Sequence, residues 1–460
     1  MSFNLAERED TIIALATPQG VGAIAVIRLS GNDAIRVTNE VFFGKNLENQ
    51  PSHTIHFGTI RDGEKIIDEV LVSIFKAPKS FTKENVVEIS THGSSYIINQ
   101  VLKLFVRKGI RLAKPGEFTQ RAFLNGQFDL AQAEAVADLI HADSETSHQA
   151  ALNQMRGGFS SEIQELRNQL IHFASMIELE LDFVEEDVEF ASRDDLRRLV
   201  ERILRIVEEL ILSFDLGNVI KNGVPTVIAG KPNAGKSTLL NALLNEEKAI
   251  VSDIAGTTRD FIEDEISIGG VIFRFIDTAG LRETTDTIEA IGVSRTQEKM
   301  KTASLILYLF DLSDTDLVEI NRDINKLENL GVPFLKVANK TDKAKANIIS
   351  ELKSNHPDTI FISAGQKENL EGLKLRILEL VNLDKFRTGN TIITNVRHYD
   401  SLTKTRESLL DVLTGLDSQV TNDFLAMDIR RALHYLGEIT GQVTTDDLLA
   451  NIFSKFCIGK

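Results

Sequence analysis

The sequence predicts a multidomain fold: an α+β N-terminal domain, an all-α helical domain, and an α/β domain with a mostly parallel sheet inserted into the helical one. Three observations support this prediction. Short β-rich runs fill the first part of the chain, helical periodicity follows, and a block of apolar runs then separates this helical region from a second one. A length of 460 residues suits about three domains of roughly 150 residues each.

The first segment, residues 1–120, mixes strand-like runs with turns that contain Gly and Pro. The runs are IIALAT, GAIAVIRL, VLVSIF and VVEIS. β-Branched and apolar residues bounded by turn residues are typical of strands. This segment is the predicted α+β domain.

Residues 121–216 form the first part of the predicted helical domain. Apolar side chains recur there every three or four residues, which is the period of an amphipathic helix. They are Ile163, Leu166, Leu170, Phe173, Ile177 and Leu181, and then Leu196, Leu199, Ile203, Val207, Leu210 and Phe214. Between the two sets lies the acidic run ELELDFVEEDVE, which fits a solvated helix end and loop, with a metal site as the alternative.

Residues 217–383 form the predicted α/β domain. Its apolar runs, most of them separated by helical stretches, indicate a parallel sheet covered on both faces. They are PTVIAG, VIFRFIDTAG, SLILYLFDL, PFLKVANK and TIFISA. ISIGGVIF instead predicts a hairpin that turns at Gly269-Gly270. Residues 384–460 are helical again, so the α/β block is predicted to be an insertion in one helical domain.

The net charge of −16 predicts that the chain as a whole repels nucleic acid. An RNA contact would therefore need a local basic patch. The stretch 103–121 has six Lys or Arg residues against Glu117 alone. A solvated helix-and-loop face and an RNA-binding patch are both compatible with it.

No apolar run approaches the roughly 18 residues of a membrane span. The opening MSFNLAERED lacks the apolar core of a signal peptide, and one cysteine cannot form an internal disulfide framework. We therefore expect a cytoplasmic protein without a membrane segment.

The most informative motif is GKPNAGKS at 230–237, which matches the phosphate-loop pattern G-x-x-x-x-G-K-S between a strand and a helix. Its glycines let backbone N–H groups surround phosphates, and the helix N-terminus adds a positive dipole end. Lys236 would reach the β- and γ-phosphates, and the Ser237 hydroxyl would ligate Mg²⁺.

Further motifs follow in the order expected of a guanine-nucleotide site. In DTAG, Asp277 suits a water-mediated Mg²⁺ contact and Gly280 an N–H bond to the γ-phosphate, while Thr258 upstream can close over Mg²⁺. In NKTD, the Asp342 carboxylate can accept from guanine N1–H and its 2-amino group, which adenine does not offer together. The predicted GTP-binding residues are Asn233, Ala234, Gly235, Lys236, Ser237, Thr238, Ser252, Asp253, Ile254, Ala255, Gly256, Thr257, Thr258, Asp277, Thr278, Ala279, Gly280, Asn339, Lys340, Asp342, Ser363 and Ala364.

NAGKS, IAGTTRD, DTAGLR and NKTD resemble the translation-factor-related GTPases in which a hydrophobic residue, here Leu281, replaces the water-orienting glutamine of Ras-like enzymes. Together with the flanking segments and the ending FCIGK (456–460), the chain over essentially its whole length resembles the MnmE family of tRNA modification GTPases.

The resemblance implies a potassium ion in place of an arginine finger, held by Asn233 and by the switch-loop residues Ser252, Ile254 and Thr257. Asn233 could instead stabilise a turn, and Arg259 or Arg282 could supply the positive charge. The resemblance also implies that Glu289 orients the attacking water; a solvated acid at a helix start is the alternative.

The resemblance also implies a tetrahydrofolate site in the N-terminal domain. Arg28 and Glu88 match its binding positions, and a carboxylate suits the donor pair of a pterin, although both residues also fit an ordinary surface. Gln127 stands where some relatives have lysine, which removes a charge. In the tail, Lys460 is an implied folate ligand. Cys457 is a possible nucleophile or, alternatively, a small buried hydrophobe.

The implied function is GTP hydrolysis, with Mg²⁺ and K⁺, coupled to addition of an aminomethyl or carboxymethylaminomethyl group to C5 of the tRNA wobble uridine. A tetrahydrofolate derivative would supply the carbon. The resemblance implies a homodimer through the N-terminal domain and a heterotetramer with an FAD-containing MnmG-like protein. The alternative is a regulatory switch in ribosome assembly, which predicts an RNA-binding C-terminus that the acidic, helical end does not resemble.

Overall fold

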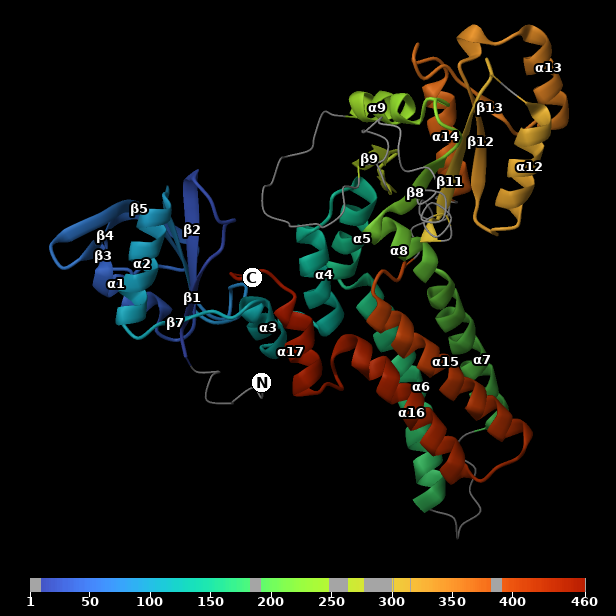
Figure 1. The fold of residues 1–460 in the computed structure, drawn as a ribbon. Helices are drawn as coiled ribbons and strands as arrows, with labels where there is room; N and C mark the ends of the chain where they lie inside the picture. The colour runs from blue at the N-terminus through green and yellow to red at the C-terminus, as the bar shows by residue number, and fades with distance from the viewer. Residues whose placement is uncertain are drawn as a thin grey trace. The chain divides into compact units, whose positions relative to one another are not determined.

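The structure is a computed structural model that describes residues 10–182, 192–247, 264–276, 300, 302–314, 316–381 and 391–459. The chain divides into two compact units. The first comprises Met1–Ile140, Ala151–Val207 and Asp400–Lys460, and the second His141–Ala150 and Glu208–Tyr399. The α/β block thus interrupts a helical region, as the sequence predicts (Figure 1). The finer boundaries at 120, 216 and 383 stay predictions.

The N-terminal part of the first unit is built on a seven-stranded sheet of order β3-β4-β5-β6-β2-β1-β7. Its strands are β1 Ile12–Leu15, β2 Gly22–Ser30, β3 Phe42–Phe43, β4 Thr54–Asp62, β5 Lys65–Phe75, β6 Val86–Gly93 and β7 Arg111–Leu112. All pairs are antiparallel except β1 with β7. The four β-rich runs seen in the sequence lie in β1, β2, β5 and β6, which confirms the α+β prediction.

The two faces of this sheet differ in burial. Helices α1 (Ala34–Val41) and α2 (Ser95–Arg107) cover one face and bury side chains such as Ile27 and Val72 completely. On the other face, Ile24, Ile55 and Phe57 are 66%, 65% and 67% exposed. Because alternate residues of a strand point to opposite faces, one face is a core and the other is open and carries these exposed apolar side chains among polar ones.

Helices make up the rest of the first unit. They are α3 Glu117–Leu124, α4 Leu130–Ile140, α6 Gly158–Asp182, α16 Asn422–Thr440 and α17 Asp446–Ser454, together with most of α7 (Arg193–Leu212) and α15 (Val396–Asp417). Helix α5 (Glu145–Met155) is shared between the units. Helix α6 packs along α16 (Figure 1). Five members of the predicted stripes, Ile163, Leu166, Leu170, Ile203 and Val207, are at most 3% exposed, so the helical periodicity is confirmed.

The second unit contains a six-stranded sheet of order β13-β12-β11-β8-β10-β9. Its strands are β8 Val224–Ala229, β9 Asp264–Ile268, β10 Val271–Phe275, β11 Leu305–Asp311, β12 Phe334–Asn339 and β13 Ile360–Phe361. Only the β9–β10 pair is antiparallel among these strands. It turns at Gly269 and Gly270, with φ of 58° and 82°, a left-handed turn that glycine tolerates. The predicted hairpin is confirmed.

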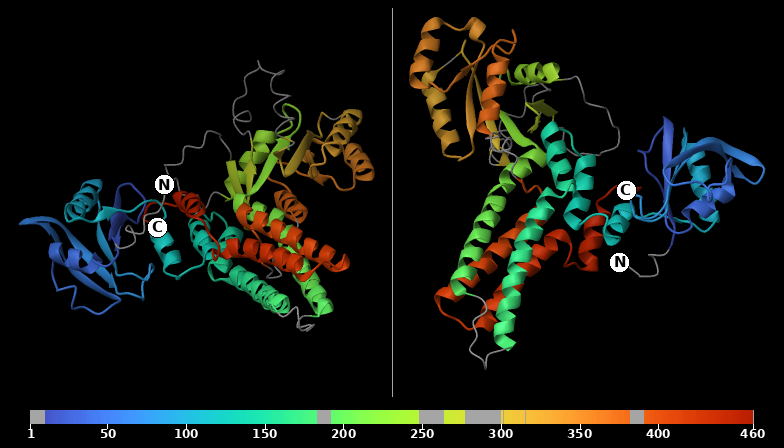
Figure 2. Two further views of the ribbon diagram at one scale, coloured as in Figure 1. Left: turned by 90° about the horizontal axis from the view of Figure 1, so that it is seen from below. Right: turned by 180° about the vertical axis from the view of Figure 1, so that it is seen from behind.

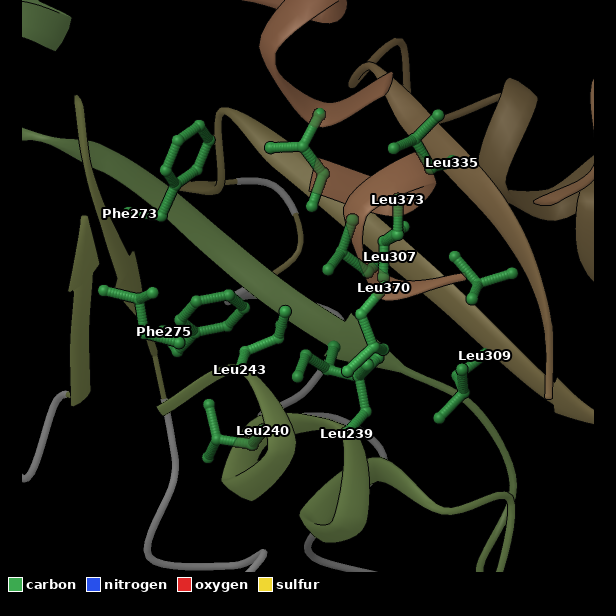
Figure 3. Packing of buried hydrophobic residues seen from close by; sticks show 14 of the residues in the cluster. Leu239, Leu240, Leu243, Phe273, Phe275, Leu307, Leu309, Leu335, Leu370 and Leu373 are labelled. Atoms are coloured by element: carbon green, nitrogen blue, oxygen red, sulfur yellow. The ribbon is translucent and has the colours of Figure 1, made fainter. Parts of the chain in front are cut away.

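Helices bury both faces of this sheet, which explains its continuous apolar runs. Along β11, Leu305, Leu307 and Leu309 face α9 (Lys236–Glu247) and α14 (Leu370–Leu380), and Figure 3 shows this packing. The alternate residues Ile306, Tyr308 and Phe310 face α12 (Leu317–Glu328) and α13 (Ala346–Asn355). The sheet is therefore buried on both faces by packed helices.

The basic stretch 103–121 is organised as a set of ion pairs. Arg111 pairs with Asp10 and Glu117, and Arg121 pairs with Asp10, Glu84 and Glu117. Glu117 is only 1% exposed and Arg121 only 6%. Arg107 and Lys108 also pair, with Asp62 and Glu40. Four of the six charges that suggested an RNA-binding patch are thus paired within the first unit, and one of them, Arg121, lies in its interior.

Candidate functional site

The phosphate loop lies between β8 and α9, so its glycines and the start of α9 meet at the carboxyl edge of the sheet. Gly230 and Gly235 have φ of 151° and 96°. A Cβ on Gly230 would approach the Leu309 carbonyl oxygen to 2.0 Å, and one on Gly235 would approach Nδ2 of Asn339 to 2.3 Å. Each of the motif's two glycines is therefore required for two reasons: its backbone has a positive φ, and a neighbouring atom leaves no room for a Cβ.

Lys236 begins α9, and its side chain folds back over the loop. Its Nζ donates to the carbonyl oxygens of Gly230 and Lys231, both at 2.8 Å. Burial lowers the pKa of this lysine below its ordinary value, because the charged form loses hydration there. A phosphate oxygen at this position would compensate that loss, since the ammonium would gain an anionic partner. Ser237 and Thr238 follow in the first turn of α9.

Asn233 has a left-handed backbone, with φ of 65°, and an exposed side chain. Asparagine tolerates this conformation better than most residues. The turn alternative and the ligand alternative for Asn233 are therefore compatible with each other: the residue makes the turn, and its amide oxygen stays accessible to a cation.

The NKTD loop at 339–342 is joined to the phosphate loop by Asn339. Its Nδ2 donates to the carbonyl oxygen of Ala234 at 2.8 Å, and its Oδ1 accepts from the N–H of Ala364 at 3.0 Å. Asn339 is 1% exposed. This single amide thus ties together three motifs that the sequence analysis identified separately.

Asp342 lies in the same loop and accepts a 2.7 Å hydrogen bond from the Ser363 hydroxyl. This bond uses Oδ1 of the carboxylate. Lys340 has φ of 62° and pairs with Asp311 at the end of β11. Asp311 was not predicted as a site residue from the sequence, although an acidic residue at the end of an apolar strand was visible there.

The remaining predicted nucleotide residues lie outside the described residues. They are Ser252 to Thr258 and Asp277 to Gly280. Glu289 and the alternative charge donors Arg259 and Arg282 also lie outside them, as does Lys460. Their assignments stay predictions. The described residues contain no group of three or more His, Cys, Asp or Glu side chains placed to hold a metal ion.

In the first unit the structure brings Arg28 and Glu88 together on the open face of the sheet. They are cross-strand partners on β2 and β6, and Nε of Arg28 donates to Oε1 of Glu88 at 2.9 Å. Both side chains keep partial exposure, 17% and 27%. A pair of this kind presents unused carboxylate and guanidinium hydrogen-bonding positions to a ligand.

The C-terminal tail reaches this pair. Nη1 of Arg28 donates to the carbonyl oxygen of Gly459 at 3.4 Å. The backbone N–H of Gly116 donates to the carbonyl oxygen of Cys457 at 3.3 Å. Figure 2 shows the C-terminal end beside the N-terminal part of the first unit. Cys457 is exposed, so the alternative that it is a buried hydrophobe is wrong.

Two aromatic rings lie near Arg28 of this pair. The Arg28 guanidinium lies 5.6 Å from the centre of the Phe81 ring and 5.8 Å from that of Phe118. Phe81 also contacts Phe128 at 5.7 Å between ring centres, next to the exposed Gln127. None of these rings was predicted as a site residue from the sequence, because phenylalanine residues are usually part of the hydrophobic core.

Comparison with known proteins shows which family the chain belongs to. Residues 130–457 match the MnmE helical domain, and residues 11–127 match the GTP-binding protein TrmE N-terminus. The tRNA modification GTPase MnmE of Cytophaga hutchinsonii is 64% identical over 98% of both chains. Those of Flavobacterium psychrophilum and Bacteroides thetaiotaomicron are 54% and 50% identical, over 98% of this chain and 99% and 100% of theirs. The chain therefore belongs to the MnmE family of tRNA modification GTPases.

Proposed function

We propose that this protein hydrolyses GTP, with Mg²⁺ and K⁺, as part of the C5 modification of wobble uridine in tRNA. The observation that carries the proposal is the 2.8 Å bond from Asn339 to Ala234. It joins the guanine-recognising loop to the phosphate-binding loop at one sheet edge, so a single nucleotide can occupy both. Carboxyl edges of parallel strands are where α/β sheets bind such ligands.

In the proposed site, Lys236 binds the β- and γ-phosphates and Asp342 selects guanine. Ser237, with Thr258, would hold Mg²⁺, and Asn233, with Ser252, Ile254 and Thr257, would hold K⁺. The hydroxyl of Ser237 and the amide oxygen of Asn233 are hard oxygen donors, which suit both ions. When bound, these cations supply positive charge for the leaving phosphate oxygen.

Glu289 is proposed to orient the attacking water, because Leu281 cannot. Glu289→Ala should lower kcat by about 100-fold while GTP affinity changes little, the pattern of an interaction made only in the transition state. Single-turnover hydrolysis and GTP titration would separate the two effects. A wild-type rate in the variant would place the water-orienting group elsewhere.

The second proposed site binds a one-carbon derivative of tetrahydrofolate at Arg28 and Glu88. The partly exposed carboxylate of Glu88 suits the paired N–H donors of a pterin, and the Phe81 ring lies near its partner Arg28. Gln127 and Lys460 complete the proposed ligand set, with Cys457 as a possible nucleophile. Direct titration of a reduced folate against wild-type protein and Glu88→Gln would test this assignment.

We also propose a homodimer through the N-terminal domain and assembly with an FAD-containing MnmG-like protein and tRNA. The exposed side chains of Ile24, Ile55 and Phe57 on one sheet face support the dimer, since an interface there would remove their apolar surface from water. Sedimentation of wild type and of Phe57→Glu would test it: a monomeric wild type would exclude this interface.

Mass analysis of tRNA nucleosides from cells lacking this chain tests the function as a whole. Loss of the wobble-uridine modification, restored by the wild-type gene, is the expected result. Unchanged wobble uridines would leave the regulatory switch in ribosome assembly as the better explanation.

Among the described residues, no helix has both the length and the apolar character that a membrane crossing requires.

A further inference from the structure

Three side chains of the guanine-recognising loop, those of Asn339, Lys340 and Asp342, have protein partners. Asn339 bonds to the phosphate loop and to Ala364, and Asp342 bonds to Ser363. All of these partners belong to motifs that the sequence analysis assigned to the nucleotide. Lys340 differs, because its partner Asp311 belongs to none of them.

Asp311 is the last residue of β11, and it is the register partner of Asn339 on the parallel strand β12. Its Oδ2 lies 2.5 Å from Nζ of Lys340. Its Oδ1 accepts from both the N–H and the hydroxyl of Ser313, at 2.8 and 2.6 Å. The two carboxylate oxygens thus have separate tasks: one fixes the carboxylate in the turn after β11, and the other holds the lysine.

Stability alone is a weak explanation for this pair. The side chains of Lys340 and Asp311 are 29% and 16% exposed, and ion pairs near the surface contribute little to folding. Lys340 also has a left-handed backbone, with φ of 62°, a conformation that costs energy for a residue with a Cβ. A strained lysine held by a dedicated carboxylate at a ligand-binding edge indicates a functional constraint.

We infer that Asp311 is a positioning residue for guanine binding, which holds the Lys340 ammonium so that the lysine stem is ordered before the base arrives. A lysine stem covers apolar surface while its charged end is anchored elsewhere, which suits the face of a purine whose edge is bound by Asp342. A lysine that is already ordered loses less rotamer entropy on binding. This inference rests on the proposed guanine site at Asn339 to Asp342.

The pKa of Asp311 supports a charged anchor. Burial alone would raise it, but hydrogen bonds from Lys340 and Ser313 hold it below its ordinary value. The carboxylate is therefore ionised throughout the neutral range, and the anchor does not depend on pH there.

Asp311→Asn is the informative variant, because it separates the two tasks of the carboxylate. The amide oxygen can still accept from Ser313, whereas the amide nitrogen cannot accept from an ammonium group. The matched control is Asp358→Asn. Asp358 pairs with Lys336 at 2.8 Å, so the control breaks a Lys–Asp pair whose lysine lies on β12, four residues before Lys340, which follows that strand.

The test uses the full-length chain and a fluorescent GDP, with pyrophosphate as a competing ligand. Asp311→Asn should weaken GDP binding about ten-fold, equivalent to about 1.4 kcal/mol, mainly by faster dissociation. The affinity for pyrophosphate, which lacks a base, and kcat at saturating GTP should stay within about two-fold, while KM rises. Asp358→Asn should leave the affinities for both ligands unchanged.

A double-mutant cycle completes the test. Lys340→Met keeps an unbranched stem without the charge, and Asp311→Asn should add nothing measurable to it if the two residues act as a unit. Unchanged GDP affinity in Asp311→Asn, equal weakening of pyrophosphate and GDP, or additive effects in the cycle would each overturn the inference. Unchanged GDP affinity in Lys340→Met and in Asp342→Ala as well would instead overturn the proposed guanine site.

Discussion

At the scale of single residues, Asn233 can be used to test whether a potassium ion, in place of an arginine finger, supplies positive charge to the site. Its left-handed φ of 65° means that Ala would add backbone strain, so Gly is the cleaner replacement. GTP turnover should be much faster in K⁺ than in Na⁺, because the sodium ion is too small for a potassium-sized ring of oxygens. Asn233→Gly should abolish this difference, and Asn233→Asp, which keeps an oxygen donor, should retain part of it. Equal wild-type rates in both salts, measured by phosphate release, would point back to Arg259 or Arg282.

The buried carboxyl of Glu117 leads to a second prediction for a single residue, on how stability depends on pH. Burial would raise the pKa of this carboxyl, but hydrogen bonds from Arg111 and from the Lys114 N–H hold it below the ordinary value. A folded-state pKa below the unfolded one stabilises the fold above the unfolded pKa, and this contribution is lost as pH falls through the folded pKa. Unfolding free energy measured in urea should therefore fall between pH 7 and acid pH.

Glu117→Gln should remove much of that acid dependence and cost about 3 kcal/mol at pH 7, since it removes the most buried carboxylate partner of Arg111 and of the buried Arg121. Glu40→Gln is the matched control. Glu40 also pairs with two cations, Arg36 and Lys108, but it is exposed, so its loss should cost less than about 1 kcal/mol. Equal costs for the two variants would contradict this account of the buried network.

At the scale of elements, Gly217 in α8 (Phe214–Asn222) marks where the chain enters the α/β block and where it leaves. A Cβ at this position would lie 1.9 Å from the carbonyl oxygen of Ile393, whose N–H bonds to the hydroxyl of Ser213. Gly217→Ala should therefore destabilise the second unit by about 3 kcal/mol, although Ala is favoured over Gly in helices by about 1 kcal/mol. Gly158→Ala in α6, with its nearest contact at 3.6 Å, should be neutral or stabilising in thermal unfolding.

Elements differ in how far the sequence reveals them. The strands β8, β11 and β12 were predictable because burial on both faces makes their own residues almost continuously apolar. The helices α6 and α7 were predictable because burial of one face repeats every three or four residues. The phosphate loop was equally predictable as one contiguous motif. The pair of Asp311 and Lys340 was not, since its partners are 29 residues apart and meet only through the register of two parallel strands. The basic stretch suggested an RNA patch for the same reason: its acidic partners Asp10 and Glu84 are distant in sequence.

At the scale of the whole chain, changes in the C-terminal tail should test the proposed folate-dependent tRNA modification independently of GTP binding. The carbonyl oxygens of Cys457 and Gly459 bond to Gly116 and Arg28, and a Cβ on Gly459 would lie 2.3 Å from the carbonyl oxygen of Leu15. These contacts fix the tail on the N-terminal part of the first unit through its backbone. The nucleotide motifs have a separate core in the second unit, so a terminal truncation should not disturb them.

Deleting residues 457–460 should therefore weaken folate binding and abolish tRNA modification while leaving GTP affinity unchanged. Cys457→Ser tests the thiol alone, because it keeps every backbone contact of the tail. Full modification by Cys457→Ser with none by the truncated chain would mean that the tail acts by its placement and its ligands. Loss in both, with folate affinity retained in Cys457→Ser, would identify the thiol as a reacting group. A truncated chain that still modifies tRNA would show that the contact between Arg28 and Gly459 has no part in the reaction.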